Sequence, residues 1–380
     1  MAGIYIHIPF CKQACHYCDF HFSTNMKKKA AMLAALKQEL LLRKDEFAGQ
    51  VVETIYFGGG TPSVLSTKEI SDLIRAVYDT YEVVATPEIT IEANPDDLSS
   101  SKLKELATSP INRLSIGIQS FFDEDLTLMN RAHSAEEAME CLREATHLFS
   151  NISIDLMYGL PNLSHARWKQ NITKALDFNI AHISSYALTV EPKTALKKFI
   201  EKGVIPKIDD DMAEEQFHIL IDMLTAAGYE HYELSNFGKP SYFSKNNTAY
   251  WLGKNYMGIG PSAHSYDGTR RGWNSRNNSL YIKSIEQQEL PMEIEVLTKT
   301  DRYNEYVMTG LRTIWGLSLQ RVISDFGTVY HDYLLQQSEK HRKEGFLSID
   351  DDTLLVTRKG KFLSDGLAAD LFMLNLEGNS

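Results

Sequence analysis

The sequence predicts an α/β fold in which a parallel sheet, open or curled into a barrel, is followed by a smaller winged-helix-like α+β domain. Three observations lead to this prediction: β-rich segments alternate with helical ones, polar residues follow the strands, and the pattern changes near residue 301. The 380 residues suffice for one large and one smaller domain. We predict these domains over residues 1–295 and 296–380.

The alternation begins near the amino terminus and continues through six strand-helix units. The predicted strands cover residues 4–8, 54–57, 88–92, 113–118, 152–157 and 182–188. The predicted helices lie near residues 67–80, 100–107, 134–149 and 165–178. A further helix is predicted over residues 26–44, with its apolar face formed by Met32, Leu33, Leu36, Leu40 and Leu41.

Polar residues and glycines follow these strands. In parallel α/β folds the loops at the carboxyl ends of the strands carry the chemistry, so we expect these residues to share one rim. They are the cysteine loop, Gly58, Gly59, Gly60, Thr61, Glu92, Asn94, Gln119, Ser120 and Asp155. The glycine run suits either close approach to a ligand or an ordinary tight turn.

Three titratable residues lie on the predicted strands themselves. Glu92 interrupts the apolar alternation of its strand, and it either binds an ammonium or hydroxyl group or faces water at the rim. Asp155 is flanked by apolar residues, and because burying it alone is costly, we expect it to be paired or ligand-bound. His7 is expected to be a hydrogen-bonded core histidine.

The cysteines are the most informative residues. Three of the four lie within eight residues in the order C-x3-C-x2-C, and they are Cys11, Cys15 and Cys18. A tight, odd-numbered cluster in a reducing compartment indicates metal ligation rather than disulfides. Zinc, completed by His16 or His21, and an iron–sulfur cluster with one open iron both suit thiolates. The position of all three on one short loop favours the cluster, and Cys141 is expected to be an ordinary buried thiol.

Composition and charge exclude several classes of protein. With 43% hydrophobic and 23% charged residues, the chain has the composition of a soluble folded protein. Its net charge of -11 repels a phosphate backbone, so nucleic acid is not expected as a partner. No apolar stretch approaches the ~18 residues of a membrane span, and the amino terminus lacks a basic leader. We therefore expect a cytoplasmic protein without stable membrane insertion.

The carboxyl-terminal region follows another pattern. After residue 301 the sequence predicts helices, then a helix over residues 330–344, then a β-hairpin turning at residues 350–352. This is the order of a winged-helix module, whose simplest role is packing or partner binding.

Eight segments together resemble the radical S-adenosylmethionine (SAM) enzymes, and within them the branch of oxygen-independent coproporphyrinogen III oxidase and the HemW-type heme chaperones. They are YIHIPFCKQACHYC (5–18), YFGGGTPS (56–63), IEANPDDL (91–98), NRLSIGIQSF (112–121), IDLMYGLP (154–161), YALTVEPKTAL (186–196), YELSNF (232–237) and MGIGPSAHSY (257–266). The oxidase carries a fourth cysteine where this sequence has Phe20, and it has a longer amino-terminal extension. Both differences favour the chaperone type.

The resemblance implies a partial (β/α)6 barrel and a set of cofactor sites. A 4Fe-4S cluster would bind Cys11, Cys15 and Cys18, and SAM would chelate its open iron. By the same resemblance, SAM would contact Tyr5, Gly59 and Glu92, with Tyr17 near the cluster. The residues that match a second SAM site of the oxidase are Gly60, Thr61, Gln119, Arg131, Asp155 and Ala187. An electron donor is implied, since reduction of the cluster cleaves SAM to a 5'-deoxyadenosyl radical.

One segment departs from the chaperone pattern. These chaperones usually show His-Asn-x-x-Tyr-Trp, and here Asn246 replaces the histidine, which puts heme ligation at that position in question because an amide binds iron poorly. His264 and His231 are the alternative ligands. Tyr250 and Trp251 either stack on a porphyrin or pack in the core.

Three functional hypotheses follow. The first is a heme chaperone that retains the cluster and SAM, binds heme and transfers it to an acceptor protein. The alternative is an oxygen-independent coproporphyrinogen III oxidase acting on a porphyrinogen in porphyrin biosynthesis. The third is a structural zinc protein. Asn246 and Phe20 are the residues on which the choice depends.

Overall fold

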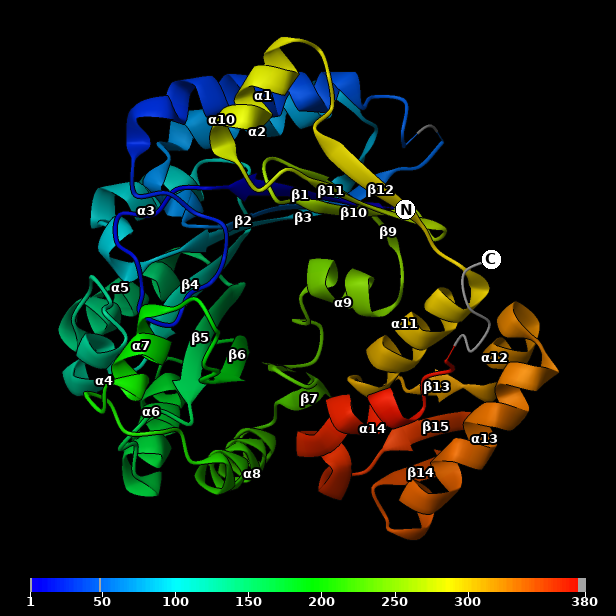
Figure 1. The fold of residues 1–380 in the computed structure, drawn as a ribbon. Helices are drawn as coiled ribbons and strands as arrows, with labels where there is room; N and C mark the ends of the chain where they lie inside the picture. Colours follow the sequence, from blue (N-terminus) through cyan, green and yellow to red (C-terminus); the bar gives the residue numbers. More distant parts are fainter. Residues whose placement is uncertain (1, 48, 375–380) are drawn as a thin grey trace.

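The computed structural model describes residues 2–47 and 49–374, and its largest feature is a curved sheet of twelve strands (Figure 1). The first six strands pair in parallel and in chain order. They are β1 (Ala2–Ile8), β2 (Val52–Gly59), β3 (Val83–Ala93), β4 (Arg113–Gln119), β5 (Ile152–Tyr158) and β6 (His182–Ala187). The predicted strands are thereby confirmed, with ends that differ by a few residues.

Shorter strands extend the sheet at both sides. On one side these are β9 (Asn255–Ile259), parallel to β1, followed by antiparallel β10 (His264–Tyr266), β11 (Arg270–Asn274) and β12 (Met292–Val296). On the other side β6 pairs with β8 (Asn236–Gly238), which pairs with β7 (Glu230–Glu233). Within the described residues β12 and β7 are the two edges, so the barrel is partial.

Helices cover the convex face of the sheet (Figure 1). They are α1 (Lys29–Leu42), α2 (Thr67–Thr80), α3 (Ser100–Ala107), α4 (Asp123–Leu128), α5 (Ala135–Leu148), α6 (His165–Asp177), α7 (Ala195–Glu201), α8 (Asp210–Ala226) and α10 (Asn278–Glu286). Short 3-10 helices lie at η1 (Met26–Lys28), η2 (Pro62–Val64), η3 (Pro95–Asp97) and η4 (Arg358–Leu363). None of the helices in the described part of the chain has the length and apolar character needed to cross a bilayer.

Local sequence explains where these helices begin and which face they bury. Ser66 begins α2 with a capping box completed by Glu69, which satisfies backbone N–H groups that have no partner within the helix. In α1 the apolar spacing buries most of the expected face, but Leu41 is 53% exposed. Its inclusion in the apolar face was wrong, because it lies about 100° around the helix from buried Leu40.

One helix lies on the concave side of the sheet (Figure 1). This helix, α9 (Lys245–Trp251), begins after Ser244, whose side chain accepts a hydrogen bond from the Asn247 N–H. The carboxylate of Glu88 on β3 accepts hydrogen bonds from the N–H groups of Lys245 at 3.0 Å and Asn246 at 3.1 Å. A negative carboxylate at the amino end of a helix interacts favourably with the helix dipole. The buried Glu88 therefore attaches α9 to β3 on the concave side of the sheet.

The remaining elements form a second unit with its own buried cluster of apolar side chains, which includes Tyr303, Val307, Leu334 and Leu354. These elements are α11 (Lys299–Leu311), β13 (Leu317–Ser318), α12 (Leu319–Phe326), α13 (Thr328–Lys343), β14 (Leu347–Asp350), β15 (Thr353–Val356) and α14 (Ser364–Asp370). The predicted hairpin is present as β14 and β15. The boundary between residues 295 and 296 stays a prediction, and residues 1 and 375–380 of the two ranges lie outside the described part.

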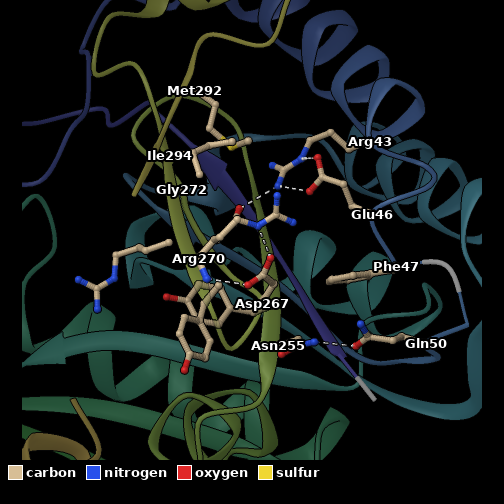
Figure 2. Close-up of a pocket in the computed structure, with 14 residues that line it drawn as sticks. Arg43, Glu46, Phe47, Gln50, Asn255, Asp267, Arg270, Gly272, Met292 and Ile294 are labelled. Atoms are coloured by element: carbon tan, nitrogen blue, oxygen red, sulfur yellow. Dashed lines mark hydrogen bonds and ion pairs between the residues drawn. The ribbon is translucent and has the colours of Figure 1, made fainter. Parts of the chain in front are cut away.

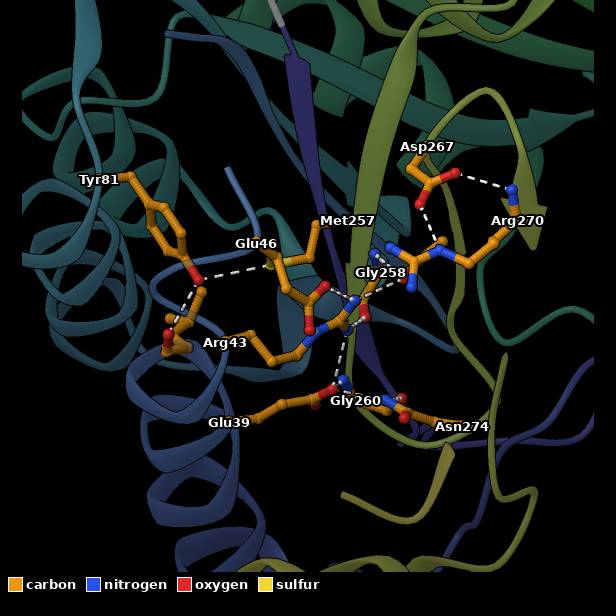
Figure 3. Close-up of polar contacts among 12 residues, drawn as sticks. Glu39, Arg43, Glu46, Tyr81, Met257, Gly258, Gly260, Asp267, Arg270 and Asn274 are labelled. Carbon is orange, nitrogen blue, oxygen red and sulfur yellow. Dashed lines mark hydrogen bonds and ion pairs between the residues drawn. The ribbon is translucent and has the colours of Figure 1, made fainter. Parts of the chain in front are cut away.

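A buried ion pair joins α1 to the strands added beside β1 (Figure 3). Arg43 Nη1 lies 3.2 Å from Glu39 Oε1, and the same nitrogen donates to the Gly258 carbonyl at 2.7 Å. Glu39 also accepts hydrogen bonds from the Tyr281 hydroxyl at 2.6 Å and the Asn274 amide at 2.7 Å. Because the remaining polar atoms are satisfied, this pair is compatible with complete burial.

Candidate functional site

The loop that follows β1 brings the three clustered cysteines to the carboxyl-end rim of the sheet. Its two ends are joined by Cys11 N, which donates to the Ser23 carbonyl at 3.1 Å, and its middle is held by His16 N, which donates to the Met129 carbonyl at 3.0 Å. A cavity of about 150 Å³, which we call the cysteine cavity, lies against it. The predicted residues that line it are Cys11, Cys15, Cys18, Tyr17, Gly59, Gly60, Thr61, Glu92, Gln119, Arg131 and Asp155.

Two of the thiols have polar neighbours that suit a thiolate. The Thr61 hydroxyl donates to Cys11 Sγ at 3.3 Å, and Arg131 Nη1 donates to Cys15 Sγ at 3.4 Å. Burial raises the pKa of both Cys11 and Cys18 to about 11, a cost that cationic iron at this position would offset. Among the described residues, no three His, Cys, Asp or Glu side chains lie close enough to hold one metal ion. The donor set fits a cluster, in which each thiolate binds a different iron.

Glu92 is fixed at the rim by its neighbours. The Tyr56 hydroxyl donates to its Oε1 at 2.8 Å and Gly59 N donates to its Oε2 at 3.2 Å, while burial raises the pKa of the carboxyl. Gly59 has a φ of 107°, and a Cβ there would lie 2.4 Å from the ring of His7. Only glycine fits this turn, which leaves the backbone close to the carboxylate.

Unpaired polar atoms face the cysteine cavity. Asp155 Oδ1 and Gln119 Oε1 are buried without a hydrogen-bond partner. Burial, reinforced by the charge of Glu92, raises the pKa of Asp155 to about 7. Arg131 bridges the Asn94 amide oxygen at 2.7 Å and a backbone carbonyl. Buried polar atoms normally have hydrogen-bond partners, so the unpaired oxygens of Asp155 and Gln119 are suited to bind a polar ligand in the cavity. Ala187, at the end of β6, is not one of the residues that line it.

A second cavity of about 550 Å³, the histidine cavity, adjoins the first. It shares Phe20, Gly59 and Glu92 with the cysteine cavity. The other residues that line it are Tyr5, His7, Asp19, His21, Tyr250, Tyr256, Ser262, Ala263, His264 and Arg276. The structure therefore brings the predicted SAM contacts Tyr5, Gly59 and Glu92 to one place.

The histidines near this cavity differ in their hydrogen bonding. His7 is buried, and its ring lies 2.9 Å from the His21 carbonyl and 3.3 Å from the Tyr5 hydroxyl, as expected of a core histidine. His264 is exposed, and its imidazole has no hydrogen bond to the described residues. His231 is buried elsewhere, with its two nitrogens at the Leu234 carbonyl and the Lys361 ammonium. Of the two alternative heme ligands, His264 is the one at a cavity.

A third cavity of about 590 Å³ lies between α9, β9 to β11 and the second unit. We call it the arginine cavity. It is lined by Tyr250, Trp251, Leu252, Gly253, Tyr256, Tyr266, Gly268, Arg271, Arg302, Glu305, Tyr306, Met308, Thr309, Arg321, Asp325 and Phe326. Tyr250 and Tyr256, whose rings meet edge to face at 4.5 Å, line both this cavity and the histidine cavity. Asn246 is not among the residues that line these three cavities.

A fourth cavity of about 190 Å³ lies beside the buried ion pair (Figure 2). Its charged side chains largely neutralise one another. Arg43 Nη2 lies 2.7 Å from Glu46, and Arg270 Nε lies 2.8 Å from Asp267. This pairing favours a structural role over ligand binding.

The sequence patterns did not identify the arginine cavity. Its arginines come from β11, α11 and α12, which are separated by tens of residues and meet only in the folded chain. Its aromatic residues give a partial signal, because the sequence indicates Tyr250 and Trp251 as candidate porphyrin contacts.

Comparisons with known proteins agree with this architecture. The Radical SAM superfamily model matches residues 5–175, and the HemN C-terminal domain model matches residues 297–363. Heme chaperone HemW of Bacillus subtilis is 33% identical over 96% of this chain and 97% of its own length. Heme chaperone HemW of Escherichia coli is 32% identical over 98% of both chains.

A solved structure extends the similarity to the whole fold. Coproporphyrinogen III oxidase of Escherichia coli, described as a radical SAM enzyme, superposes with a TM-score of 0.85. The match covers 98% of this chain and 90% of the oxidase at 25% identity. The α/β fold with a mostly parallel sheet and an added carboxyl-terminal domain is thereby confirmed.

Proposed function

The chain belongs to the family of the heme chaperone HemW, within the radical SAM superfamily, and from that premise we propose that it binds heme and transfers it to an acceptor protein. The observation that carries the proposal is the similarity to HemW chaperones of distant bacteria over nearly the whole chain. Phe20, at the position of the oxidase's fourth cysteine, supports the same reading. Full-length similarity is stronger support than the shared fold, which hosts several chemistries.

We propose that Cys11, Cys15 and Cys18 hold a 4Fe-4S cluster and that SAM lies against it. When bound, these groups supply one-electron chemistry that protein side chains lack. The chain's own contribution is positioning, in which Thr61 and Arg131 donate to the first two thiolates. Glu92, already held by Tyr56 and Gly59, presents a carboxylate suited to the ammonium or ribose hydroxyls of SAM.

A second polar contact set lies deeper in the cysteine cavity. The unpaired Asp155 and Gln119 oxygens and the Arg131 guanidinium offer both acceptors and donors there. Gly60 and Thr61 complete the wall, whereas Ala187 does not line the cavity. These residues suit the far end of one SAM molecule, and the cavity is small for two.

Heme would bind without the histidine that the chaperones usually carry at the position of Asn246. Asn246 is 3% exposed, its Oδ1 accepts a hydrogen bond from Thr54, and it does not line the cysteine, histidine or arginine cavity. Tyr250, Trp251 and the exposed ring of His264 remain as contacts on the concave side. Transfer requires an acceptor protein, and reduction of the cluster requires an electron donor. We place the protein in the cytoplasm, without nucleic acid or stable membrane insertion.

The second candidate is an oxygen-independent coproporphyrinogen III oxidase acting on a porphyrinogen. The observation that favours it is the superposition with the Escherichia coli oxidase over 98% of the chain, together with the polar cysteine cavity. Phe20 weighs against it.

An anaerobic absorbance titration of the cluster-reconstituted protein with heme tests the proposal. We expect a saturable Soret change near one equivalent that Tyr250→Ala weakens, because Tyr250 lines both large cavities, and His264→Ala tests whether that histidine contacts the heme. Tyr78→Ala and His147→Ala, both exposed on outer helices, are matched controls that should bind as the wild type does. Absence of saturable binding would reject the chaperone. Conversion of coproporphyrinogen with release of 5'-deoxyadenosine would instead establish the oxidase.

A further inference from the structure

We propose that the arginine cavity is the binding site of a planar tetrapyrrole, held by aromatic rings and by contact of its carboxylate arms with Arg302 and the neighbouring arginines. The proposal rests on the proposed heme function and assigns that function a place and a set of contacts. The cavity, about 590 Å³ in volume, lies within the usual size range of small-molecule sites.

The walls of the cavity suit a flat apolar ligand. Tyr250 and Trp251 come from α9, Tyr256 from β9, Tyr306 from α11 and Phe326 from α12. Aromatic side chains bind planar rings by stacking and edge-to-face contacts. Figure 1 shows α9 between the sheet and α11, and residues of both helices line the cavity.

The charges of the cavity leave one cation without a partner. Arg271 pairs with Glu305, and Arg321 Nε lies 3.1 Å from Asp325. Arg302, on the same wall as Glu305, forms no ion pair or side-chain hydrogen bond within the described residues, and its Nε is buried without a partner. Three guanidinium groups against two carboxylates give the cavity one net positive charge. The Arg302 guanidinium, which has no charged partner among the described residues, is suited to bidentate binding of a ligand carboxylate.

The three arginines line the cavity together with Tyr266. Burial raises the pKa of Tyr266, while the charges of Arg302, Arg271 and Arg321 act in the opposite direction. Trp251 adds a further donor, because its Nε1 is buried without a hydrogen-bond partner. An anion beside Tyr266 would meet donors from α9, β11, α11 and α12.

This combination favours a tetrapyrrole with carboxylate arms over other planar anions. Heme has a large apolar face and places its two carboxylates on one edge, which matches aromatic walls with one cationic corner. A nucleotide has a smaller base and needs a site for consecutive phosphates, where the two paired carboxylates of Glu305 and Asp325 would be unfavourable. The shared wall of Tyr250 and Tyr256 would then separate the tetrapyrrole from the histidine cavity, so this site predicts that His264→Ala leaves heme binding unchanged.

The test is a heme titration of the cluster-reconstituted full chain carrying Arg302→Gln. Loss of a charge-assisted contact should weaken heme binding about ten-fold or more, and Arg302→Lys should recover part of it. Arg75→Gln, on the exposed side of α2, is the matched control and should bind heme as the wild type does. Heme dimethyl ester, which has no free carboxylates, should bind wild type and Arg302→Gln equally.

The outcomes separate this inference from the proposed function. If the wild type shows no saturable heme binding, both fail. If the wild type binds heme and Arg302→Gln binds it equally well, the chaperone proposal stands and the site is wrong. Tighter Arg302-dependent binding of ATP than of heme would overturn the ligand class. Unchanged urea midpoints of the variants would show that weaker heme binding does not reflect loss of folding. If the midpoints change, equal binding of the dimethyl ester by wild type and Arg302→Gln would show that the site is still folded.

Discussion

The hydroxyl of Thr54 donates a hydrogen bond to Oδ1 of Asn246 across 3.0 Å, near the amino end of β2. A Cβ on Gly3 of β1 would lie 3.4 Å from the same oxygen. Asn246 therefore fills the space between α9 and the first two strands. The residue that departs from the chaperone pattern is a packed and satisfied part of the barrel interior.

This arrangement predicts that Asn246→Ala affects stability and leaves the heme spectrum unchanged. Removal of the amide leaves the buried Thr54 hydroxyl without an acceptor, so we expect a loss of about 1–3 kcal/mol in the free energy of unfolding. Urea denaturation measures the loss, and the Soret maximum of the heme complex should keep its position. A shifted maximum with unchanged stability would mean that Asn246 reaches the iron.

The cysteine loop predicts that three of the four cysteines are needed for iron binding and that Cys141 is not. Serine at Cys11, Cys15 or Cys18 should reduce iron from about four atoms per chain to background, because three thiolates are the minimum that holds the cluster. Cys141→Ser is the matched control, since that thiol is buried in α5 among apolar residues. Iron analysis of anaerobically reconstituted protein provides the measurement. Full iron content in a loop variant would contradict the assignment, and stoichiometric zinc in the wild type would favour a structural site.

The buried carboxyl of Asp155 predicts a pH-dependent loss of stability. Burial raises its pKa to about 7 in the folded chain, against 3.8 for an ordinary aspartate, so the folded chain keeps a proton that the unfolded chain releases. The contribution of this residue should be most favourable below pH 4, fall as the pH rises to about 7, and then level off. The rise in pKa from 3.8 to about 7 corresponds to about 4 kcal/mol in total.

Asp155→Asn should remove this dependence, and Asp79→Asn, on the exposed side of α2, should keep it. The quantity to measure is the difference in urea midpoint between wild type and variant from pH 4 to 8, without SAM. A difference that does not change with pH would indicate that the carboxyl ionises normally.

The ion pair beneath the added strands predicts a large effect of one substitution. Arg43→Met leaves Glu39 charged and buried, which should cost about 3–5 kcal/mol of unfolding free energy. Arg270→Met breaks the exposed pair with Asp267 and should cost less than about 1 kcal/mol (Figure 2). Adding Glu39→Gln to Arg43→Met should recover part of the loss. Equal effects of the two single variants would show that burial of Glu39 does not matter.

Local patterns predicted the six parallel strands and their helices well, because alternation and capping act over a few residues. The same reasoning placed Cys11, Glu92 and Asp155 on one rim, since strand ends in a parallel sheet share an edge. Ala187 was carried over from the family resemblance alone, and no wall of the cysteine cavity includes it.

Residues 195–296, between the six strand-helix units and the carboxyl-terminal region, were largely invisible to the same patterns. Strands such as β10 and β8 have three residues each, too few to show alternation, and they form because long-range partners are already in place. The arginine cavity depends on this region. In the sequence Arg271 and Arg302 are indistinguishable from ordinary surface arginines. They line the same cavity only because the folded chain brings α11 close to β11.

The position of β1 in the sheet has a consequence for synthesis of the chain. β1 pairs with β2, which follows about fifty residues later, and with β9, which follows about 250 residues later. While the ribosome is still making the middle of the protein, β1 is therefore an unprotected sheet edge, and Glu39 and Arg43 lack Gly258 and Tyr281. The cysteine loop grows directly from this strand. Its scaffold is finished only when most of the chain has emerged, so a cluster held by these cysteines, as we propose, would meet its complete site only late in synthesis.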